Sequence, residues 1–138
     1  MPDPNETPDD FQMAGPHRIR VELPDIVHVK LEGDVQLEHI RAMYSRLDDM
    51  PNPNRSYLLR DARRVGEITP KAREFLVKAS EQTHVAAVVT FGSSFHARVL
   101  LTMVVSAVRV LRPSSPRLVF VKTEQDARAW IEEDRKRR

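Results

Sequence analysis

The sequence predicts one α/β domain built on a mixed five-stranded sheet with four helices. Three observations support this prediction. Apolar and charged residues alternate early in the chain, apolar residues recur at helical spacing in several later segments, and residues 85–91 form a continuous apolar run typical of a strand covered on both faces. A length of 138 residues suits one ordinary domain. The expected element order is β-β-α-β-α-β-α-β-α.

The first part of the chain predicts an arm followed by a hairpin. Residues 1–16 are rich in proline and acidic side chains, so apolar burial cannot offset the entropy of ordering them, and we expect a flexible N-terminal arm. The folded domain is expected to occupy residues 17–138. From His17 onward apolar and charged residues alternate, Pro24 then turns the chain, and a second strand ends at Gly33.

The middle of the chain predicts two helices around a short strand. Asp34 is placed to cap a helix that ends at Pro51, because proline has no amide proton to donate and restricts the residue before it. Residues 57–59 predict a short strand that ends at Asp61. Thr69 followed by Pro70 predicts the start of the second helix.

The last part predicts a central strand, a long helix, an edge strand and a final helix. The apolar run at residues 85–91 is followed by a long helix at residues 95–111 and by a strand at residues 118–121. Thr123, three positions before Asp126, resembles a capping box that opens the final helix. Strands separated by helices pair in parallel, so we expect only the first strand to run antiparallel.

The helix expected at residues 95–111 has more apolar surface than one sheet covers. Its apolar side chains spread over roughly 200°, whereas packing on a sheet uses a stripe of little more than about 100°. The apolar side chains that the sheet does not cover pack either against a neighbouring helix of the same domain or against another protein. The second hypothesis predicts an interface that includes Leu101, Val105 and Val108, with a protein partner or with a second copy of the chain as a homodimer.

Composition excludes several classes of function. The chain has no cysteine, which suits a reducing compartment, so we expect a cytoplasmic protein. The most apolar stretch, residues 99–108, is far shorter than the roughly 20 residues that span a bilayer. The basic residues 135–138 and the acidic residues 132–134 are expected to form a solvated helix end rather than a nucleic-acid surface. The five histidines show no ligand spacing, so we expect no metal and no cofactor, and His28 is expected at the surface.

The best candidate for a ligand site follows the central strand. Gly92 opens a loop at the carboxyl end of that strand, where open α/β sheets bind ligands and where a helix start presents backbone donors to an anion. An ordinary serine cap explains the same loop. The candidate ligand-binding residues are Asp61, Arg63, Ser93, Ser94 and His96. Neither a nucleotide-loop spacing nor a Gly-x-Ser-x-Gly elbow is present, so we expect no catalytic residue and no enzymatic activity.

A family resemblance adds to this interpretation. The hairpin, the repeated helix and strand units, Gly33 and Asp61 precede a closing segment that consists of Thr123, Glu124, Ala127, Trp130 and Ile131. This arrangement resembles the SpoIIAA-like branch of the STAS superfamily, many members of which end in a similar segment, and the resemblance extends over residues 17–133.

The resemblance implies a role in bacterial regulation or signalling through protein binding. In the anti-sigma-factor antagonists of that superfamily, the third strand leads to an Asp-x-Ser motif whose serine is phosphorylated. Arg63 stands at the position of that serine and cannot accept phosphate, so the resemblance implies the fold and protein binding without this switch. The branch is also similar to the CRAL-TRIO lipid carriers, which implies an alternative function as a carrier or sensor of a small apolar or anionic ligand.

Overall fold

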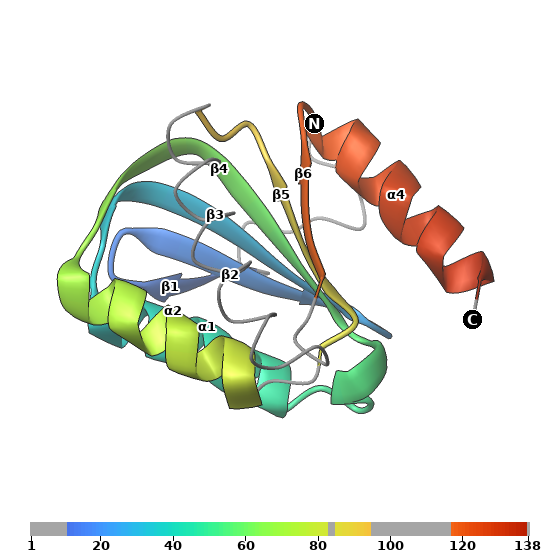
Figure 1. Ribbon diagram of the computed structural model, residues 1–138, viewed down its shortest axis with the longest axis horizontal. Coiled ribbons are helices and arrows are strands. Elements are labelled where there is room, and N and C mark those ends of the chain that lie inside the picture. Colours follow the sequence, from blue (N-terminus) through green and yellow to red (C-terminus); the bar gives the residue numbers. More distant parts are fainter. Residues whose placement is uncertain (1–10, 83–84, 95–116, 138) are drawn as a thin grey trace.

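The structure, a computed structural model, describes residues 11–82, 85–94 and 117–137. Its centre is one mixed sheet of six strands that lie side by side in chain order (Figure 1). The strands are β1 (Gln12–Ala14), β2 (His17–Glu22), β3 (Ile26–Val35), β4 (Tyr57–Ile68), β5 (Ala87–Phe91) and β6 (Arg117–Val121). The helices are α1 (Leu37–Asp48), the short 3-10 helix η2 (Pro53–Arg55), α2 (Pro70–Gln82) and α4 (Glu124–Lys136).

The prediction of an α/β fold with a mixed sheet is confirmed, but the predicted number of strands is wrong. The described residues contain six strands instead of five and three α-helices instead of four. The helix expected at residues 95–111 lies outside the described residues. Its predicted interface residues Leu101, Val105 and Val108 lie outside them as well.

The additional strand, β1, belongs to the segment that was expected to be a flexible arm. Gln12 pairs with Ile19 and Ala14 with His17, so β1 runs antiparallel to the edge of β2. Ala14 is buried in the core, and backbone pairing with β2 holds this short segment, which follows the proline-rich acidic residues. Order in the N-terminal region therefore begins before residue 17.

The predicted hairpin and the parallel strands that follow it are confirmed. β2 and β3 pair antiparallel, with Ile19 opposite Val29, and β3, β4, β5 and β6 pair in parallel. β4, however, is far longer than the short strand expected at residues 57–59. Because β3 itself extends to Val35, β4 finds a ladder partner as far as Ile68, across two register shifts.

The length of β3 also moves the start of α1. Asp34, expected to cap α1, lies within β3, and its carboxylate accepts a hydrogen bond from the amide of Glu67 at 2.9 Å. Gln36 is the N-cap residue instead, and its amide donates to Nδ1 of His39 at 3.1 Å. At the start of α2, Thr69 Oγ1 accepts a hydrogen bond from the amide of Ala72 at 3.3 Å, as predicted.

Helices cover both faces of the sheet, each over a different set of strands (Figure 1). On the first face, here called the α1 face, α1 packs on β1–β3 and α2 packs on α1. On the second face, the α4 face, α4 packs on β4–β6. The α1 face includes the buried side chains Ile19, Val29, Leu58 and Val88 with Ile40, Met43 and Leu47 of α1. The α4 face includes Ile26, Tyr57, Leu59, Val89 and Phe91 with Ala127 and Ile131 of α4.

Candidate functional site

Asp61 and Arg63 lie within β4 and form a bidentate ion pair. Arg63 Nε and Nη2 donate to Oδ1 and Oδ2 of Asp61 at 3.0 and 2.7 Å, and the Arg63 amide donates to Oδ1 at 3.1 Å. Asp61 is 7% exposed, whereas most of the Arg63 side chain faces solvent. The prediction that both residues follow the strand is wrong, because β4 continues along β3 for several more residues.

The chemistry of Asp61 is set by this ion pair. Burial alone would raise the pKa of Asp61, but the side-chain and backbone hydrogen bonds from Arg63, together with its charge, outweigh burial and hold the pKa below its ordinary value. Asp61 is therefore ionised at neutral pH, with both oxygens engaged. A carboxylate in this state is a poor general base and a poor phosphate acceptor.

The loop after β5 lies against the same arginine. Gly92 has φ of +75°, and a Cβ atom there would lie 2.3 Å from Cγ of Arg63, so glycine permits this close approach. Ser93, the next residue, is partly buried and Ser94 is exposed. The structure thus brings Asp61 and Arg63 to the loop that contains Ser93, as the sequence predicted, while His96 lies outside the described residues. No ligand contact tests this group of residues, and it stays a prediction.

A second polar cluster, on the α4 face, was missed by sequence analysis. Glu22 of β2 accepts hydrogen bonds from Arg128 of α4 at 2.8 and 3.0 Å, and from Arg20 at 3.1 Å. Nδ1 of His28 lies 3.2 Å from Oε2 of Glu22. Burial alone would raise the pKa of Glu22, but the hydrogen bonds and positive charges around it outweigh burial and hold the pKa far below its ordinary value.

The ionised Glu22 determines the tautomer of His28. A carboxylate can only accept a hydrogen bond, so Nδ1 of the neutral imidazole is the protonated nitrogen and Nε2 has the lone pair. Nε2 is buried and has no hydrogen-bond partner among the described residues. The expectation of a surface histidine is wrong: His28 is 1% exposed, because Phe11 from the presumed arm packs edge-on against its ring at 5.8 Å.

A pair of buried histidines connects the hairpin to α1. His17 Nδ1 accepts from the amide of Glu32 at 2.9 Å, so the proton of the neutral ring is on Nε2, which lies 3.1 Å from both Nδ1 of His39 and the carbonyl oxygen of Asp34. Burial, then the neighbouring His39, lowers the pKa of His17. The contacts of His17 with Glu32, His39 and Asp34 are all within the protein, which indicates that His17 has a structural role.

The hairpin also has a basic and apolar surface that α4 does not cover. Arg18 and Lys30 lie opposite each other on β2 and β3, on the α4 face, and Met13 is 63% exposed beside Arg18. Lys30 and Arg20 both approach the ring of Phe11, at 4.6 and 4.4 Å from its centroid. We call Phe11, Met13, Arg18 and Lys30 the hairpin surface.

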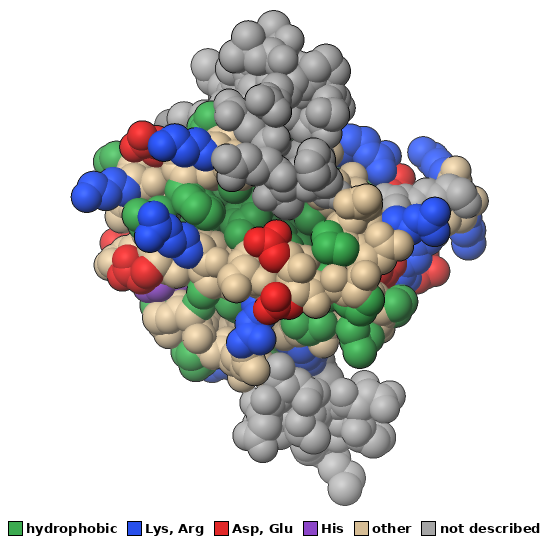
Figure 2. Space-filling view, turned by 90° about the horizontal axis from the view of Figure 1, so that it is seen from below, with side chains coloured by type: hydrophobic (Ala, Val, Ile, Leu, Met, Phe, Trp, Pro, Cys, Tyr) green, Lys and Arg blue, Asp and Glu red, His purple; other side chains and the backbone are tan. Residues whose placement is uncertain are grey.

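The opposite side of the molecule differs from the hairpin surface. Figure 2 shows that side from below, where Lys, Arg, Asp and Glu side chains lie interspersed among apolar ones.

Within the described ranges, no group of three His, Asp or Glu side chains is placed to hold a metal ion. None of the described helices is long and apolar enough to cross a bilayer.

Comparison with known proteins supports the fold. The structure is similar to a protein of the DUF3478 family with a SpoIIAA-like fold from Shewanella loihica PV-4, with 18% identity, coverage of 82% of this chain and 90% of that one, and a TM-score of 0.56. It is also similar to the anti-sigma factor antagonist SpoIIAA in its unphosphorylated form, with 9% identity, coverage of 88% and 97%, and a TM-score of 0.53. No protein-family model matches the sequence, and no curated protein matches it significantly.

These similarities confirm the class of fold that the sequence resemblance implied. The chain has a SpoIIAA-like fold. At 18% and 9% identity the two comparisons support the fold alone.

Proposed function

We propose that this chain is a non-enzymatic regulatory module that binds another protein through the hairpin surface, without a phosphorylation switch at position 63. SpoIIAA, a protein of similar fold, is an anti-sigma factor antagonist. The Asp61–Arg63 ion pair supports the second part of the proposal, because it fills the corresponding site with a guanidinium that has no hydroxyl to phosphorylate.

The observation that supports a binding surface is the pair of like charges on the hairpin. Arg18 is opposite Lys30 in the register of β2 and β3, and like charges directly opposite each other destabilise a sheet. Neither forms an ion pair with a carboxylate of the described residues. Exposed Met13 and the partly buried ring of Phe11 add apolar area beside these charges. A basic surface with an apolar centre favours an acidic protein segment that contains apolar side chains.

Site-specific photo-crosslinking in cells tests this proposal. A photoreactive residue at position 13 is expected to form a defined adduct with an acidic protein. The same residue at position 73, exposed on α2 and far from the hairpin surface, is the matched control and is expected to form none. The adduct is expected to disappear when Arg18→Glu and Lys30→Glu are combined. An adduct that persists in this double variant, or that forms equally at both positions, would contradict the proposal.

A second copy of the chain is another candidate for the partner, and ligand transport is another candidate for the function. If the partner is a second copy of the chain, the adduct at position 13 has twice the mass of the chain, and sedimentation shows a dimer that Arg18→Glu with Lys30→Glu dissociates. The alternative function is that of a carrier or sensor of a small apolar or anionic ligand. Native mass spectrometry separates the two, because a carrier retains a small molecule.

A further inference from the structure

The first ten residues are opposite in charge to the rest of the chain. Residues 1–10, here called the acidic segment, contain four acidic side chains and no basic one, and they lie outside the described residues. The formal net charge of the whole chain is +2, so without these four acids the remaining residues have a formal charge of +6. The four acids are Asp3, Glu6, Asp9 and Asp10. Opposite charges on one chain attract each other wherever the geometry lets them meet.

The described structure fixes the point at which the acidic segment is attached. Phe11 follows Asp10 directly, and its ring packs edge-on against His28 on the α4 face, with 5.8 Å between the ring centroids. Nζ of Lys30 lies 4.6 Å from the centroid of the Phe11 ring. The acidic segment therefore starts at the hairpin surface.

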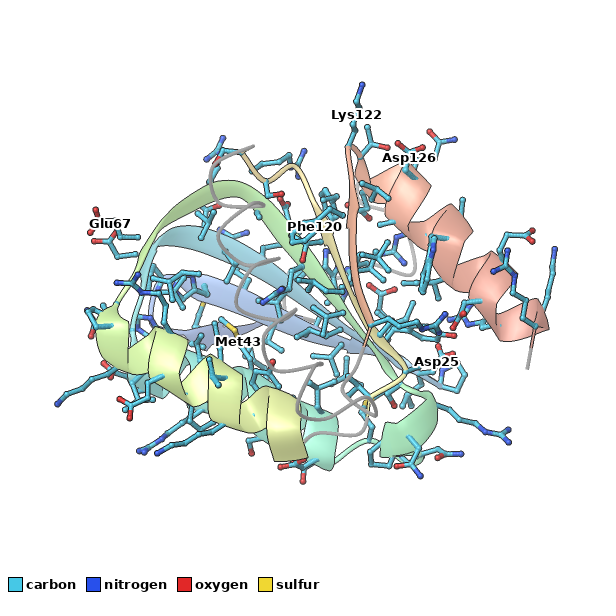
Figure 3. All side chains as sticks on the ribbon, in the orientation of Figure 1. Asp25, Met43, Glu67, Phe120, Lys122 and Asp126 are labelled. Atoms are coloured by element: carbon cyan, nitrogen blue, oxygen red, sulfur yellow. The ribbon has the colours of Figure 1, made fainter. Side chains whose placement is uncertain are left out.

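The two cations of the hairpin surface are accessible and lack a carboxylate. Arg18 is exposed and Lys30 is partly buried, and neither forms an ion pair with a carboxylate of the described residues. Of the described helices, α4 lies on this face, but it packs on β4–β6. Figure 3 labels Asp126 of α4 beside β6, at the far side of the sheet from the hairpin. A carboxylate beside Arg18 and Lys30 would relieve the repulsion between them.

The acidic segment is long enough to reach these cations. In the register of β2 and β3, Arg18 and Lys30 lie two residues along the strands from Arg20 and His28, which is a separation of about 7 Å. Ten extended residues span up to about 33 Å. Because the segment and the surface belong to one chain, the effective concentration of the segment is on the order of millimolar, so weak surface ion pairs suffice to hold it. Three of the ten residues are proline, which reduces the conformational entropy that docking costs.

We propose that the acidic segment docks on the hairpin surface of its own chain, where its carboxylates neutralise Arg18 and Lys30, and that it thereby competes with the acidic protein partner. The competition rests on the proposed function, whereas the docking does not, because it involves this chain alone. Residues 2–10 contain no apolar side chain except proline, so the segment covers the charges without the apolar contact that Met13 offers to a partner. A partner that contacts both the charges and Met13 displaces the segment.

Paramagnetic broadening of NMR signals in the full chain tests the docking. The chain has no cysteine, so Thr7→Cys provides a single attachment site for a nitroxide label. The reference is a neutral-segment variant with the same label, which combines Asp3→Asn, Glu6→Gln, Asp9→Asn and Asp10→Asn. The label is expected to broaden the Arg18 Nε–H and Lys30 amide signals about threefold more strongly in the acidic chain than in the reference. The amide of Arg41, on α1 at the other face of the same strands, is expected to be broadened equally in both chains, and about 1 M NaCl is expected to remove the difference at Arg18 and Lys30.

Binding of a synthetic hexaglutamate peptide to the full chain tests the competition. If the acidic segment occupies the surface for about four-fifths of the time, the neutral-segment variant binds this peptide about fivefold more tightly than the wild type. The matched control removes the same number of negative charges from exposed positions in or next to α1 and α2, through Glu38→Gln, Asp48→Asn, Asp49→Asn and Glu74→Gln. These charges lie on helices of the other face, so the control is expected to bind the peptide with an affinity within about twofold of the wild type.

Several results would overturn the proposal. Equal broadening of the Arg18 and Lys30 signals in the acidic chain and in the reference would show that the carboxylates do not hold the segment on the hairpin surface. Equal hexaglutamate affinity of the wild type and the neutral-segment variant, or an equal gain in the control, would show that the segment does not compete. If a spin-labelled chain broadens these signals in an unlabelled, isotope-enriched chain mixed with it, the segment docks on a second copy instead.

The docking and the proposed function fail independently. A missing crosslink at position 13 in cells would contradict the proposed protein binding and leave the paramagnetic broadening unaffected. A crosslink whose yield is the same in the wild type and in the neutral-segment variant would contradict the competition, because removal of the four charges is expected to raise that yield.

Discussion

Among the described helices, the two that lie directly on the sheet, α1 and α4, differ in how much ion pairs add to their apolar packing. α1 packs on its face through the buried apolar side chains of Ile40, Met43 and Leu47. α4 buries the small side chain of Ala127 together with Ile131, packs the partly buried Trp130 beside them, and is held in addition by ion pairs. These join Arg128 to Glu22, Arg135 to Asp25 and Asp134 to Arg117.

This difference shows how the chemistry of a contact decides which conditions weaken it. Apolar burial is roughly proportional to the area removed from water and is insensitive to salt and to protonation. Ion pairs weaken as salt screens them and as carboxylates become protonated. The contacts that hold α1 and those that hold α4 are therefore expected to weaken under different conditions, although both helices belong to one domain.

The largest expected effect is on the α1 face. Leu47 is 1% exposed, so Leu47→Ala leaves a cavity under α1 and is expected to lower the free energy of unfolding by about 3 kcal/mol. Urea unfolding measures this loss. The loss is expected to be the same at about 0.1 M and 1 M NaCl, since no charge is involved. A loss that changes strongly with salt would contradict the proposed difference between the faces.

A smaller effect is expected on the α4 face. Asp134 is 4% exposed, binds Arg117 through both oxygens at 2.8 Å and accepts a hydrogen bond from the Tyr57 hydroxyl at 2.7 Å. Asp134→Ala is expected to cost about 2 kcal/mol, because it removes the acceptor for both groups. Unfolding in urea is measured at low and high salt, and high salt is expected to reduce the cost.

The control for Asp134 is its neighbour in the same helical turn. Glu133 is exposed and, within the described residues, forms only a long ion pair with Lys136, at 3.6 Å. Glu133→Ala is expected to change stability by less than about 0.5 kcal/mol. Equal losses in the two variants would mean that the buried contacts of Asp134 do not stabilise α4.

A further effect is a loss of stability in acid that occurs in two separate pH ranges. The folded pKa of His17 lies below its ordinary value of 6.5, so below that pH the unfolded chain takes up a proton that the folded chain does not, and stability falls. The folded pKa of Glu22 lies below its ordinary value of 4.5, so by the same reasoning its contribution is lost only below that second pH.

Two variants assign these pH ranges to the two faces. Between about pH 7.5 and pH 5.5, His17→Gln is expected to lose less stability than the wild type, whereas Glu22→Gln behaves like the wild type. Below about pH 4.5, Glu22→Gln is expected to lose less stability than the wild type, whereas His17→Gln is expected to behave like the wild type. Denaturant unfolding across this range measures both slopes. Identical pH profiles for the three proteins would refute the assignment.

Local patterns in the sequence correctly predicted most of the elements. The alternation after His17 gave β2, the apolar run gave β5, and Thr123 caps α4 by accepting a hydrogen bond from the amide of Asp126 at 3.1 Å. These features depend on neighbours within a few residues, which are visible in any sequence. The length of β4 was missed because it depends on β3, which supplies the ladder partners from 31 to 33 positions earlier in the chain.

The candidate site was predicted only in part, for a related reason. Asp61 and Arg63 were identified and do lie together beside Gly92. Asp134 was expected in a solvated turn, but it is buried by contacts with Tyr57 and Arg117, 77 and 17 positions away.

The sequence by itself determined the kind and order of most of the described secondary-structure elements, because hydrophobic periodicity and capping residues act over a few positions. Only the tertiary structure decided which polar side chains are buried and whether each has a partner. The free energy of a charge or an imidazole depends on the groups that surround it in space. For Asp134 those groups come from β4 and β6, strands that precede α4 by 77 and 17 positions at the residues in contact.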